Sequence, residues 1–263
     1  MKKNTLFIIS FLFLLFSCSK SDETNSNIIL VKKISSNLVY NSGQQGFNNS
    51  FTYIYDNNKI IKASTVLGNY TDNKIITYNQ DLISKIEFYN NENLIVQTIS
   101  FIYDNNKLIT VINQSYNKVT TNYTYNIDGT ITFIKTNLDL STNITSNISS
   151  GKLIFSSGNL LKKVETKAET PDITETITFE YDAKNSPFKN VLGLNLILDN
   201  FGFIYAGNLF SSSNNKIALT RISTDDNILN SINQGALQYD GNNFVINQVI
   251  NNDTFVVTNI FEY

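Results

Sequence analysis

A short phrase that recurs seven times constrains the fold of this chain more than any other feature of its sequence. Each copy has an alternating, aromatic-rich stretch, then in most copies Tyr-Asp or Tyr-Asn, then a polar turn and an aliphatic run. The copies are FTYIYDNNKIIKAS from Phe51, ITYNQDLISKIEFYN from Ile76, SFIYDNNKLITVIN from Ser100, YTYNIDGTITFIK from Tyr123, KLIFSSGNLLKKVE from Lys152, ITFEYDAKNSPFKN from Ile177 and LQYDGNNFVINQVI from Leu237. In the first six copies the aromatic residues before the turn are spaced by 23, 25, 22, 30 and 26 residues. This is the length of two strands of about nine residues with their two turns.

The alternation within each copy predicts strands and not helices. Ile99, Phe101 and Tyr103 fall on one face of such a strand, whereas Thr98, Ser100 and Asp104 fall on the other. A period of two is typical of a strand that is buried on one face. The repeated unit is therefore predicted to be a β-hairpin.

Aspartates recur just after the last aromatic residue of a strand or within the turn that follows. They are Asp56, Asp104, Asp128, Asp182 and Asp240. Aspartate, asparagine and glycine supply the backbone conformations and local hydrogen bonds that turns need, and the chain has only two prolines to do so. We therefore predict a structural role in turns for these five carboxylates. No catalytic residue is predicted, and no calcium-loop spacing is present, so no metal ligand is predicted either.

The phrases resemble the YD repeats of RHS-type proteins, and more closely a family of Bacteroidota lipoproteins of unknown function that carry divergent repeats of this kind. The resemblance covers roughly residues 28 to 263, with Asn58-Lys59 and Asn106-Lys107 where RHS repeats often have Gly-Arg. It implies an all-β fold: a long antiparallel meander of hairpins, roughly sixteen strands in one domain at 28–263. Such a meander is expected to curl, or to close into a barrel-like sheet.

The repeat breaks near residues 187–205, where an apolar stretch lacks the alternation. We predict a short helix or a buried loop that caps one end of the sheet, as is usual for repeat folds. The alternative is a plug or lid over a cavity inside the curled sheet.

The N-terminus predicts a membrane anchor. Lys2 and Lys3 precede an apolar run at 6–16, which has the length of a secretory signal and is too short to span a bilayer. The following Leu-Phe-Ser-Cys resembles a bacterial lipobox, which implies that residues 1–17 are removed and that Cys18 is acylated and holds the protein in the membrane. The alternative is an ordinary signal peptide with a chance cysteine.

Residues 18–27 then form a polar tether. Within it Lys20, Asp22 and Glu23 resemble the export signal of surface lipoproteins, and a simple solvated linker is the alternative. We expect an outer-membrane location, with the choice between the cell surface and the periplasm left open.

Composition excludes several chemistries. The chain has no histidine and one cysteine, so imidazole and thiolate zinc sites, Ser-His-Asp triads and disulfide frameworks are unavailable. Without residues 1–17 it has 18 basic and 22 acidic residues, and this net charge gives no footprint for nucleic acid. We predict no cofactor.

The leading functional hypothesis is a non-catalytic binding or structural lipoprotein whose partner is a glycan or an envelope protein. Tyrosines that pointed outward could stack on sugar rings. The alternatives are a carboxylate-dependent glycan hydrolase or lyase, which needs two close carboxyls in a concave site, and an accessory subunit of an outer-membrane uptake complex. A transmembrane barrel is disfavoured by the lipobox and by the many Thr and Asn residues that would face lipid.

Overall fold

The computed structural model describes residues 28–44, 46–198, 212–224, 229–233, 235–251 and 253–263, and within them the protein is almost entirely β-structure. The strands are β1 (Lys33–Tyr40), β2 (Phe47–Asp56), β3 (Lys59–Leu67), β4 (Tyr70–Asn79), β5 (Leu82–Tyr89), β6 (Ile95–Asp104), β7 (Lys107–Gln114), β8 (Asn117–Tyr125), β9 (Ile131–Asp139), β10 (Ile144–Ser156), β11 (Asn159–Lys167), β12 (Thr174–Asn185), β13 (Asn214–Ser223), β14 (Leu229–Asn233), β15 (Ala236–Tyr239), β16 (Val245–Asn251) and β17 (Phe255–Glu262). One 3₁₀ turn, η1 (Leu194–Leu196), interrupts them.

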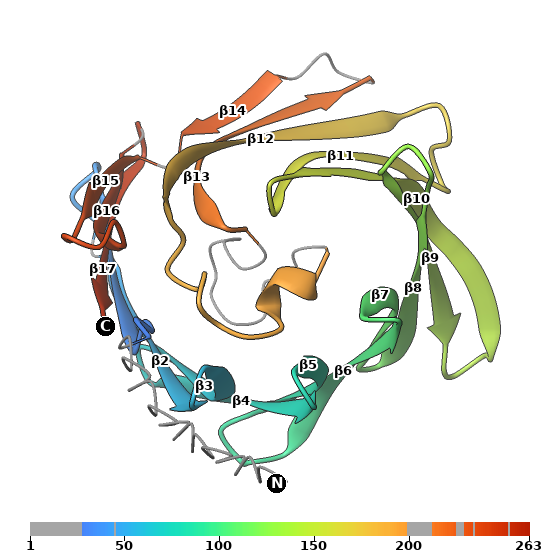
Figure 1. Cartoon of the computed structure of the whole chain (residues 1–263), viewed down its shortest axis with the longest axis horizontal. Coiled ribbons are helices and arrows are strands. Elements are labelled where there is room, and N and C mark those ends of the chain that lie inside the picture. The colour runs from blue at the N-terminus through green and yellow to red at the C-terminus, as the bar shows by residue number, and fades with distance from the viewer. Residues whose placement is uncertain (1–27, 45, 199–211, 225–228, 234, 252) are drawn as a thin grey trace, which may run out of the picture.

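The strands form one antiparallel meander that curls until its first and last strands meet (Figure 1). β1 pairs with β2 on one side and with β17 on the other, in register from Lys33 opposite Glu262. The predicted all-β meander of hairpins is therefore confirmed. Within the described residues no helix is long and apolar enough to cross a membrane.

The ring of strands is interrupted at one seam. β14 pairs with β13, whereas β15, which starts three residues after β14 ends, pairs with β16. The described residues give no register between β14 and β15, so the sheet is curled but not closed by a continuous ladder. These two strands are only five and four residues long and take the place of one, which explains seventeen strands where roughly sixteen are predicted.

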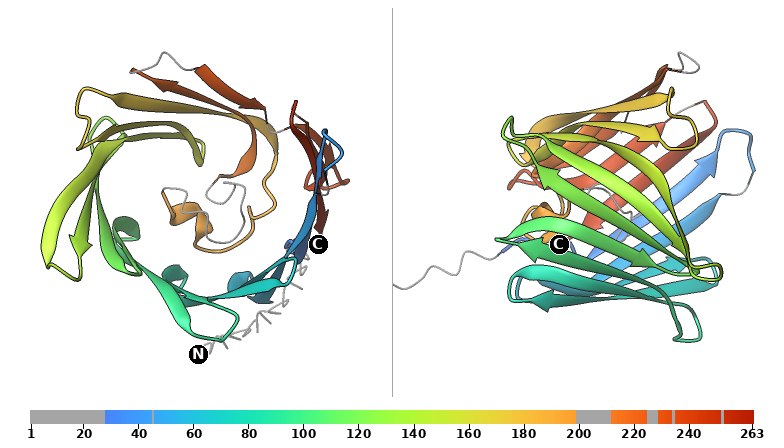
Figure 2. Two further views of the ribbon diagram at one scale, coloured as in Figure 1. Left: turned by 180° about the vertical axis from the view of Figure 1, so that it is seen from behind. Right: turned by 90° about the vertical axis from the view of Figure 1, so that its right-hand side faces the viewer.

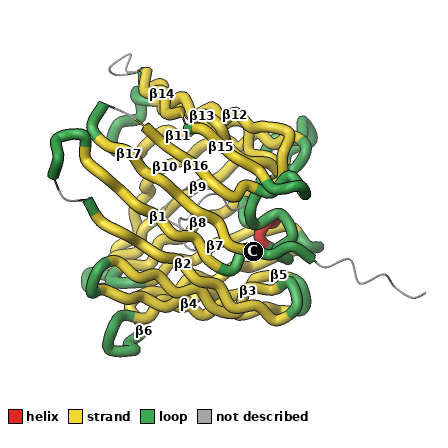
Figure 3. Tube along the Cα trace, turned by 90° about the vertical axis from the view of Figure 1, so that its left-hand side faces the viewer, coloured by secondary structure: helices red, strands yellow, loops and turns green. Residues whose placement is uncertain are grey.

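The polar turns of the repeat lie at one end of the curled sheet. We call it the plugged end, because the apolar segment after β12 lies inside it. The alternate turns form the far end (Figures 2 and 3). Turns of the plugged end are at 56–59, 79–82, 104–107, 125–131, 156–159 and 239–245, and turns of the far end are at 40–47, 67–70, 89–95, 114–117, 139–144 and 167–174. Asn57 and Asn105 hold positive φ angles of 53° and 48° in these turns. Asparagine tolerates this left-handed conformation, and so it takes the place of glycine.

A β-bulge recurs at the last aromatic residue of several repeats. The register shifts between Ile54 and Tyr55, and the same shift occurs at Tyr78, Tyr103 and Phe155. It pairs Tyr55 with Ile60, which is 1% exposed, and leaves Ile61 38% exposed. The extra residue thus keeps the tyrosine and the first aliphatic residue of the next strand inside the curl.

Three tyrosines of the repeat bind their strands to an earlier part of the chain at the plugged end. The hydroxyl groups of Tyr55, Tyr125 and Tyr181 donate to the backbone carbonyls of Val31, Leu108 and Leu160, at 2.6, 3.2 and 2.9 Å. Burial raises the pKa of all three tyrosines, so each keeps its proton and remains a donor.

We expect Tyr181→Phe to lower the free energy of unfolding by about 1 kcal/mol, because it removes one of these hydrogen bonds. Tyr103 is the matched control, since its buried hydroxyl has no hydrogen-bond partner among the described residues. Tyr103→Phe should leave stability unchanged or increase it. Urea denaturation of both variants measures the difference, and equal effects would contradict the proposed role of the hydroxyl.

The apolar segment after β12 lies inside the curl at the plugged end, as Figure 1 shows in orange. Phe188 is 2% exposed and packs edge-on against Tyr53, with ring centroids 5.2 Å apart. Leu192 donates its backbone N–H to the carbonyl of Asn58 at 2.9 Å and accepts a hydrogen bond from the hydroxyl of Tyr78 at 3.2 Å. The predicted capping segment is confirmed for residues 187–198, which we call the plug because they lie inside the curl, and its remainder, 199–205, lies outside the described residues.

Candidate functional site

The residues predicted for anchoring and export lie outside the described part of the chain. They are Cys18, Lys20, Asp22 and Glu23, and lipidation and export therefore remain predictions. The entry of the chain is described from residue 28. Ile29 accepts a hydrogen bond from the side-chain amide of Asn190 at 3.0 Å, so the chain enters the fold at the plugged end.

Four of the five predicted turn aspartates lie at turns of the plugged end, and all four make local hydrogen bonds. Asp56 and Asp104 each accept from the side-chain amide of the next asparagine at 3.1 Å. Asp128 accepts from the backbone N–H and the hydroxyl of Thr130, which lowers the pKa of this carboxyl. Asp240 accepts two backbone N–H groups of its own turn. These carboxylates follow one another around the end of the sheet, each within its own turn.

Asp182 differs from the turn position that its sequence predicts, because it lies within β12. Its carboxylate accepts hydrogen bonds from the backbone N–H and from the side-chain amide of Asn215 on β13, each at 3.2 Å. It also accepts the hydroxyl of Tyr239 on β15. The side chain of Asp182 therefore joins three strands across the seam at the plugged end, where the ladder is interrupted.

A cluster of charged residues on the inner face is a feature that the sequence did not reveal. Glu165 on β11 lies 3.4 Å from Lys135 and 3.0 Å from Lys163, and the hydroxyl of Ser149 donates to it at 2.6 Å. Burial alone would raise the pKa of Glu165, but the hydrogen bond from Ser149 and the two lysine charges outweigh it and lower the pKa to about 2.

Stability should fall in acid because of this cluster. The folded pKa of Glu165 lies below its ordinary value of 4.5. Its contribution is therefore complete above pH 4.5 and is lost as pH falls toward 2. We expect Glu165→Gln to lose on the order of 1–2 kcal/mol at pH 7, after solvent screening, and to show a flatter loss of stability from pH 5 to 2. Chemical denaturation at several pH values tests this. An unchanged acid profile would show that other carboxylates dominate.

Glu165 has a second carboxylate opposite it. Glu175 on β12 is its cross-strand partner and is held 2.9 Å from Arg221. The two line a small pocket of about 310 Å³ near the far end, with Lys167, Glu169, Thr170, Ile173 and Ser223. Paired glutamates on facing strands of one hairpin, as in VETKAETPDITETI, are the signal from which sequence reasoning could have found this site.

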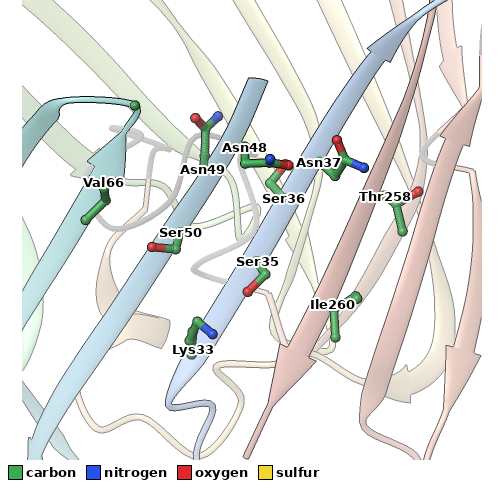
Figure 4. A pocket seen from close by; sticks show the side chains of 11 residues that line it. Lys33, Ser35, Ser36, Asn37, Asn48, Asn49, Ser50, Val66, Thr258 and Ile260 are labelled. Carbon is green, nitrogen blue, oxygen red and sulfur yellow. The ribbon is translucent and has the colours of Figure 1, made fainter. Parts of the chain in front are cut away.

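A groove lies on the outer wall, where β17, β1, β2 and β3 run side by side (Figure 4). Its volume is about 670 Å³, within the range of sites that bind small molecules. Its lining is Lys33, Ser35, Ser36, Asn37, Asn48, Asn49, Ser50, Val66, Gly68, Thr258 and Ile260. Ser35 and Ser50 are cross-strand partners, and the buried Ile34 and Phe51 beside them face inside. Ser35 and Ser50 therefore face outward.

The inner face behind this groove is polar as well. Ser36 is opposite Asn49 on β2 and Asn259 on β17, and Asn259 donates to the side-chain oxygen of Gln248 at 3.0 Å. The Oδ1 atoms of Asn49 and Asn259 are buried and have no hydrogen-bond partner among the described residues. Buried polar atoms of this kind are normally satisfied by protein, water or ligand. This part of the wall is thus built of amides and hydroxyls on both faces.

The lining of the groove is nearly neutral. Lys33 is its one charged residue, and its ammonium lies 3.0 Å from the carboxylate of Glu262. Val66 and Ile260 add apolar surface and are 39% and 51% exposed. In the described part of the chain, no group of three or more acidic or cysteine side chains is placed to hold a metal ion. The groove can therefore offer hydrogen bonds and apolar contacts, and little charge.

Comparison with known proteins identifies the fold. No family model matches the sequence, and no curated protein matches it. A solved porin-like protein from Bacteroides uniformis ATCC 8492 matches with a TM-score of 0.54 and 13% identity, over 88% of this chain and 98% of that one. A porin-like protein from Bacteroides vulgatus ATCC 8482 matches with a TM-score of 0.55 and 15% identity, over 89% and 98%. The likeness establishes the fold alone. The resemblance to lipoproteins with YD repeats stays a prediction.

Proposed function

We propose that this chain is a lipid-anchored envelope protein that binds a glycan in the outer groove and does not transform it. The observation that carries the proposal is the groove itself, which is of ligand size and has no carboxylate among its described lining residues. Its outward-facing polar side chains are mainly hydroxyls and amides: Ser35, Ser50, Thr258, Asn37 and Asn48. Hydrolysis of a glycan needs a pair of carboxyl groups at a set separation. Binding needs only hydrogen bonds and apolar contact.

The chemistry of the groove matches that of a neutral sugar. Asn37 and Asn48 are exposed cross-strand partners, and each amide offers a donor and an acceptor side by side. Val66 and Ile260 can pack against the C–H faces of a sugar ring. Tyr55 and Tyr125 are half-buried in the curl and donate to backbone carbonyls. These repeat tyrosines therefore give no outward stacking platform.

The placement of charge supports an outer wall that faces water. Lys62 and Lys162 are cross-strand partners of Ile54 and Ile154, which alternate with inward-facing residues. Lysines in the middle of strands on the outer face would be costly against hydrocarbon. The outer faces of the strands are therefore poorly suited to contact lipid, and an acylated Cys18 is the better means of membrane attachment. Because the chain enters at the plugged end, this end would face the membrane.

A glycan array with the full-length lipoprotein, followed by titration calorimetry with the best neutral oligosaccharide, tests the binding role. Asn37→Ala and Asn48→Ala should each weaken binding about tenfold or more, since each removes hydrogen bonds to the ligand. Asn122→Ala is the matched control, because Asn122 is an asparagine in a different groove of the outer wall. Equal losses in all three variants, or no glycan bound, would contradict the proposal.

The anchor is tested by metabolic labelling with an alkyne fatty acid and by membrane fractionation. Cys18→Ala should abolish the label and release the protein into the soluble fraction. The triple variant Lys20→Ala, Asp22→Ala, Glu23→Ala should keep the label. If the wild type is digested by protease on intact cells and the triple variant is protected, the tether is an export signal. A labelled Cys18→Ala variant would refute acylation at this residue.

A glycan hydrolase is the second candidate, and the facing carboxylates of Glu165 and Glu175 favour it. Both are held by cations, and the low pKa of Glu165 prevents it from donating a proton near neutral pH. We therefore rank it below binding. Release of reducing sugar from the bound glycan, lost in Glu175→Gln, would establish the hydrolase.

A further inference from the structure

Large apolar side chains are exposed on the far end of the sheet, on one side of its circumference. They belong to five consecutive hairpins, from β1–β2 to β9–β10, which lie at the end opposite the plug; the right-hand view of Figure 2 shows the β1–β2 hairpin in blue, away from the orange plug. We call this set the apolar crescent: Val39, Phe47, Leu67, Tyr70, Leu94, Ile95, Val96, Tyr116, Leu140 and Ile144, which are 42% to 96% exposed.

The plugged end carries fewer exposed large apolar side chains among its described residues. Ile127 in the 125–131 turn is fully exposed, and the strand residues that flank the other turns are 36% to 53% exposed: Ile54, Ile61, Ile102, Leu161 and Ile246. The remaining far-end hairpins are more polar in their described residues, with exposed Glu169 and Asp172 between β11 and β12 and Asp253 between β16 and β17; Ile222 near the end of β13 is 46% exposed. The crescent is thus a local feature and not a general property of hairpin tips.

Large exposed apolar side chains that gather at one place and are bordered by polar residues mark an interaction site. The charged residues that border the crescent are mostly acidic. Glu92 lies in the β5–β6 turn, Asp139 at the end of β9, and Glu169 and Asp172 in the next far-end hairpin, whereas Lys118 near the start of β8 and Lys167 at the end of β11 are basic. Two copies that met through their crescents would bring these acidic groups together, which disfavours self-association. An anionic bilayer surface is disfavoured by the same charges.

The position of the tether also makes it unfavourable for the crescent to contact the membrane that holds the anchor, given the proposed acylation of Cys18. The chain enters at the plugged end, and residues 18–27 span at most about 36 Å when fully extended. A ten-residue strand is already about 33 Å long. The crescent could reach the same bilayer only if the tether ran straight along the outer wall.

We propose that the apolar crescent docks a different envelope protein, one that presents an apolar surface bordered by lysine and arginine. Apolar contact would supply most of the binding free energy, and the acidic border would select and orient a basic partner. The groove adjoins the crescent at the β1–β2 and β3–β4 hairpins, where Asn48 follows Phe47 and Val66 and Gly68 flank Leu67. The other three hairpins of the crescent contribute no lining residue to the groove, so docking is tested on these.

Site-specific photo-crosslinking in cells that produce the full-length protein tests this. A photoreactive phenylalanine analogue replaces Leu94, Tyr116 or Ile144, each on a different hairpin, and Ile127 at the plugged end is the matched exposed control. We expect one adduct of the same added mass from all three positions and at least tenfold less from Ile127. Mass spectrometry should map the crosslink to an apolar segment bordered by Lys or Arg. The charge reversals Glu92→Lys and Asp172→Lys should reduce the adduct several-fold.

Three results would overturn the proposal: no adduct, an adduct with twice the mass of the chain, or crosslinks to lipid only. The second would assign the crescent to a second copy, and the third to a membrane. Fractionation of the same cells distinguishes a failure of the docking proposal from a failure of the proposed function. If the wild type is absent from the membrane fraction, the anchor has failed. If it is present without a protein adduct, the docking proposal has failed.

Discussion

Phe188→Ala should lower the free energy of unfolding by about 3–5 kcal/mol, the largest loss that we expect from one side chain. Phe188 is 2% exposed and contacts Tyr53 edge-on, and it stands in the plug segment together with the buried Val191, Leu194 and Ile197. Removing its ring leaves a cavity between the plug and the sheet. Backbone hydrogen bonds of the plug restrict its collapse into this space.

Urea denaturation followed by far-ultraviolet circular dichroism measures this effect. Phe47→Ala is the matched control, because Phe47 is 45% exposed at the far end and should cost about 1 kcal/mol or less. If both variants lose the same stability, the plug does not contribute to the cooperative core. Loss of cooperativity in Phe188→Ala alone would show that the plug positions the strands around it.

Gly151→Ala should destabilise the protein by about 2–3 kcal/mol, although it adds a single methyl group. A Cβ atom at Gly151 would lie 2.0 Å from the carbonyl oxygen of Val164 and 2.6 Å from the ring of Phe133. Phe133 is 2% exposed and is the cross-strand partner of Gly151. Its ring can move only by disturbing the ammonium groups of Lys135 and Lys163, which lie 5.9 and 5.4 Å from its centroid.

Gly241→Ala is the matched control for this prediction. Nothing lies within 4 Å of a Cβ atom at Gly241, and its φ angle is not positive. We expect a change within about 0.5 kcal/mol. Thermal unfolding of the two variants provides the comparison. Equal melting temperatures would show that β10 and β11 can separate enough to admit a side chain.

Most of the repeat could be predicted from the sequence because its causes are local. Alternation places Phe101 and Tyr103 on one face of a strand, and Asp-Asn-Asn turns reverse the chain within a few residues. The lost alternation near 187 likewise predicts a segment that cannot pair as a strand. These features depend on residues that are neighbours in the chain.

The candidate sites could not be predicted in this way, because they join distant parts of the chain. Glu165 meets Lys135 from another hairpin, and Asp182 meets Asn215 and Tyr239 across the seam. The aspartate looks like the other turn aspartates in sequence. Its role differs because the chain after β12 enters the curl and does not form a short turn.

The sequence by itself determined the antiparallel meander and the capping segment, because hairpins and turns are set by short-range patterns; the anchor stays a prediction from such a pattern. Only the tertiary structure decided where the meander curls, which residues meet at the β1–β17 junction, and hence that the groove exists. The groove is formed by the first three strands and the last one, which are about 200 residues apart in the chain. Its chemistry therefore follows from curling of the sheet, which is a property of the whole chain.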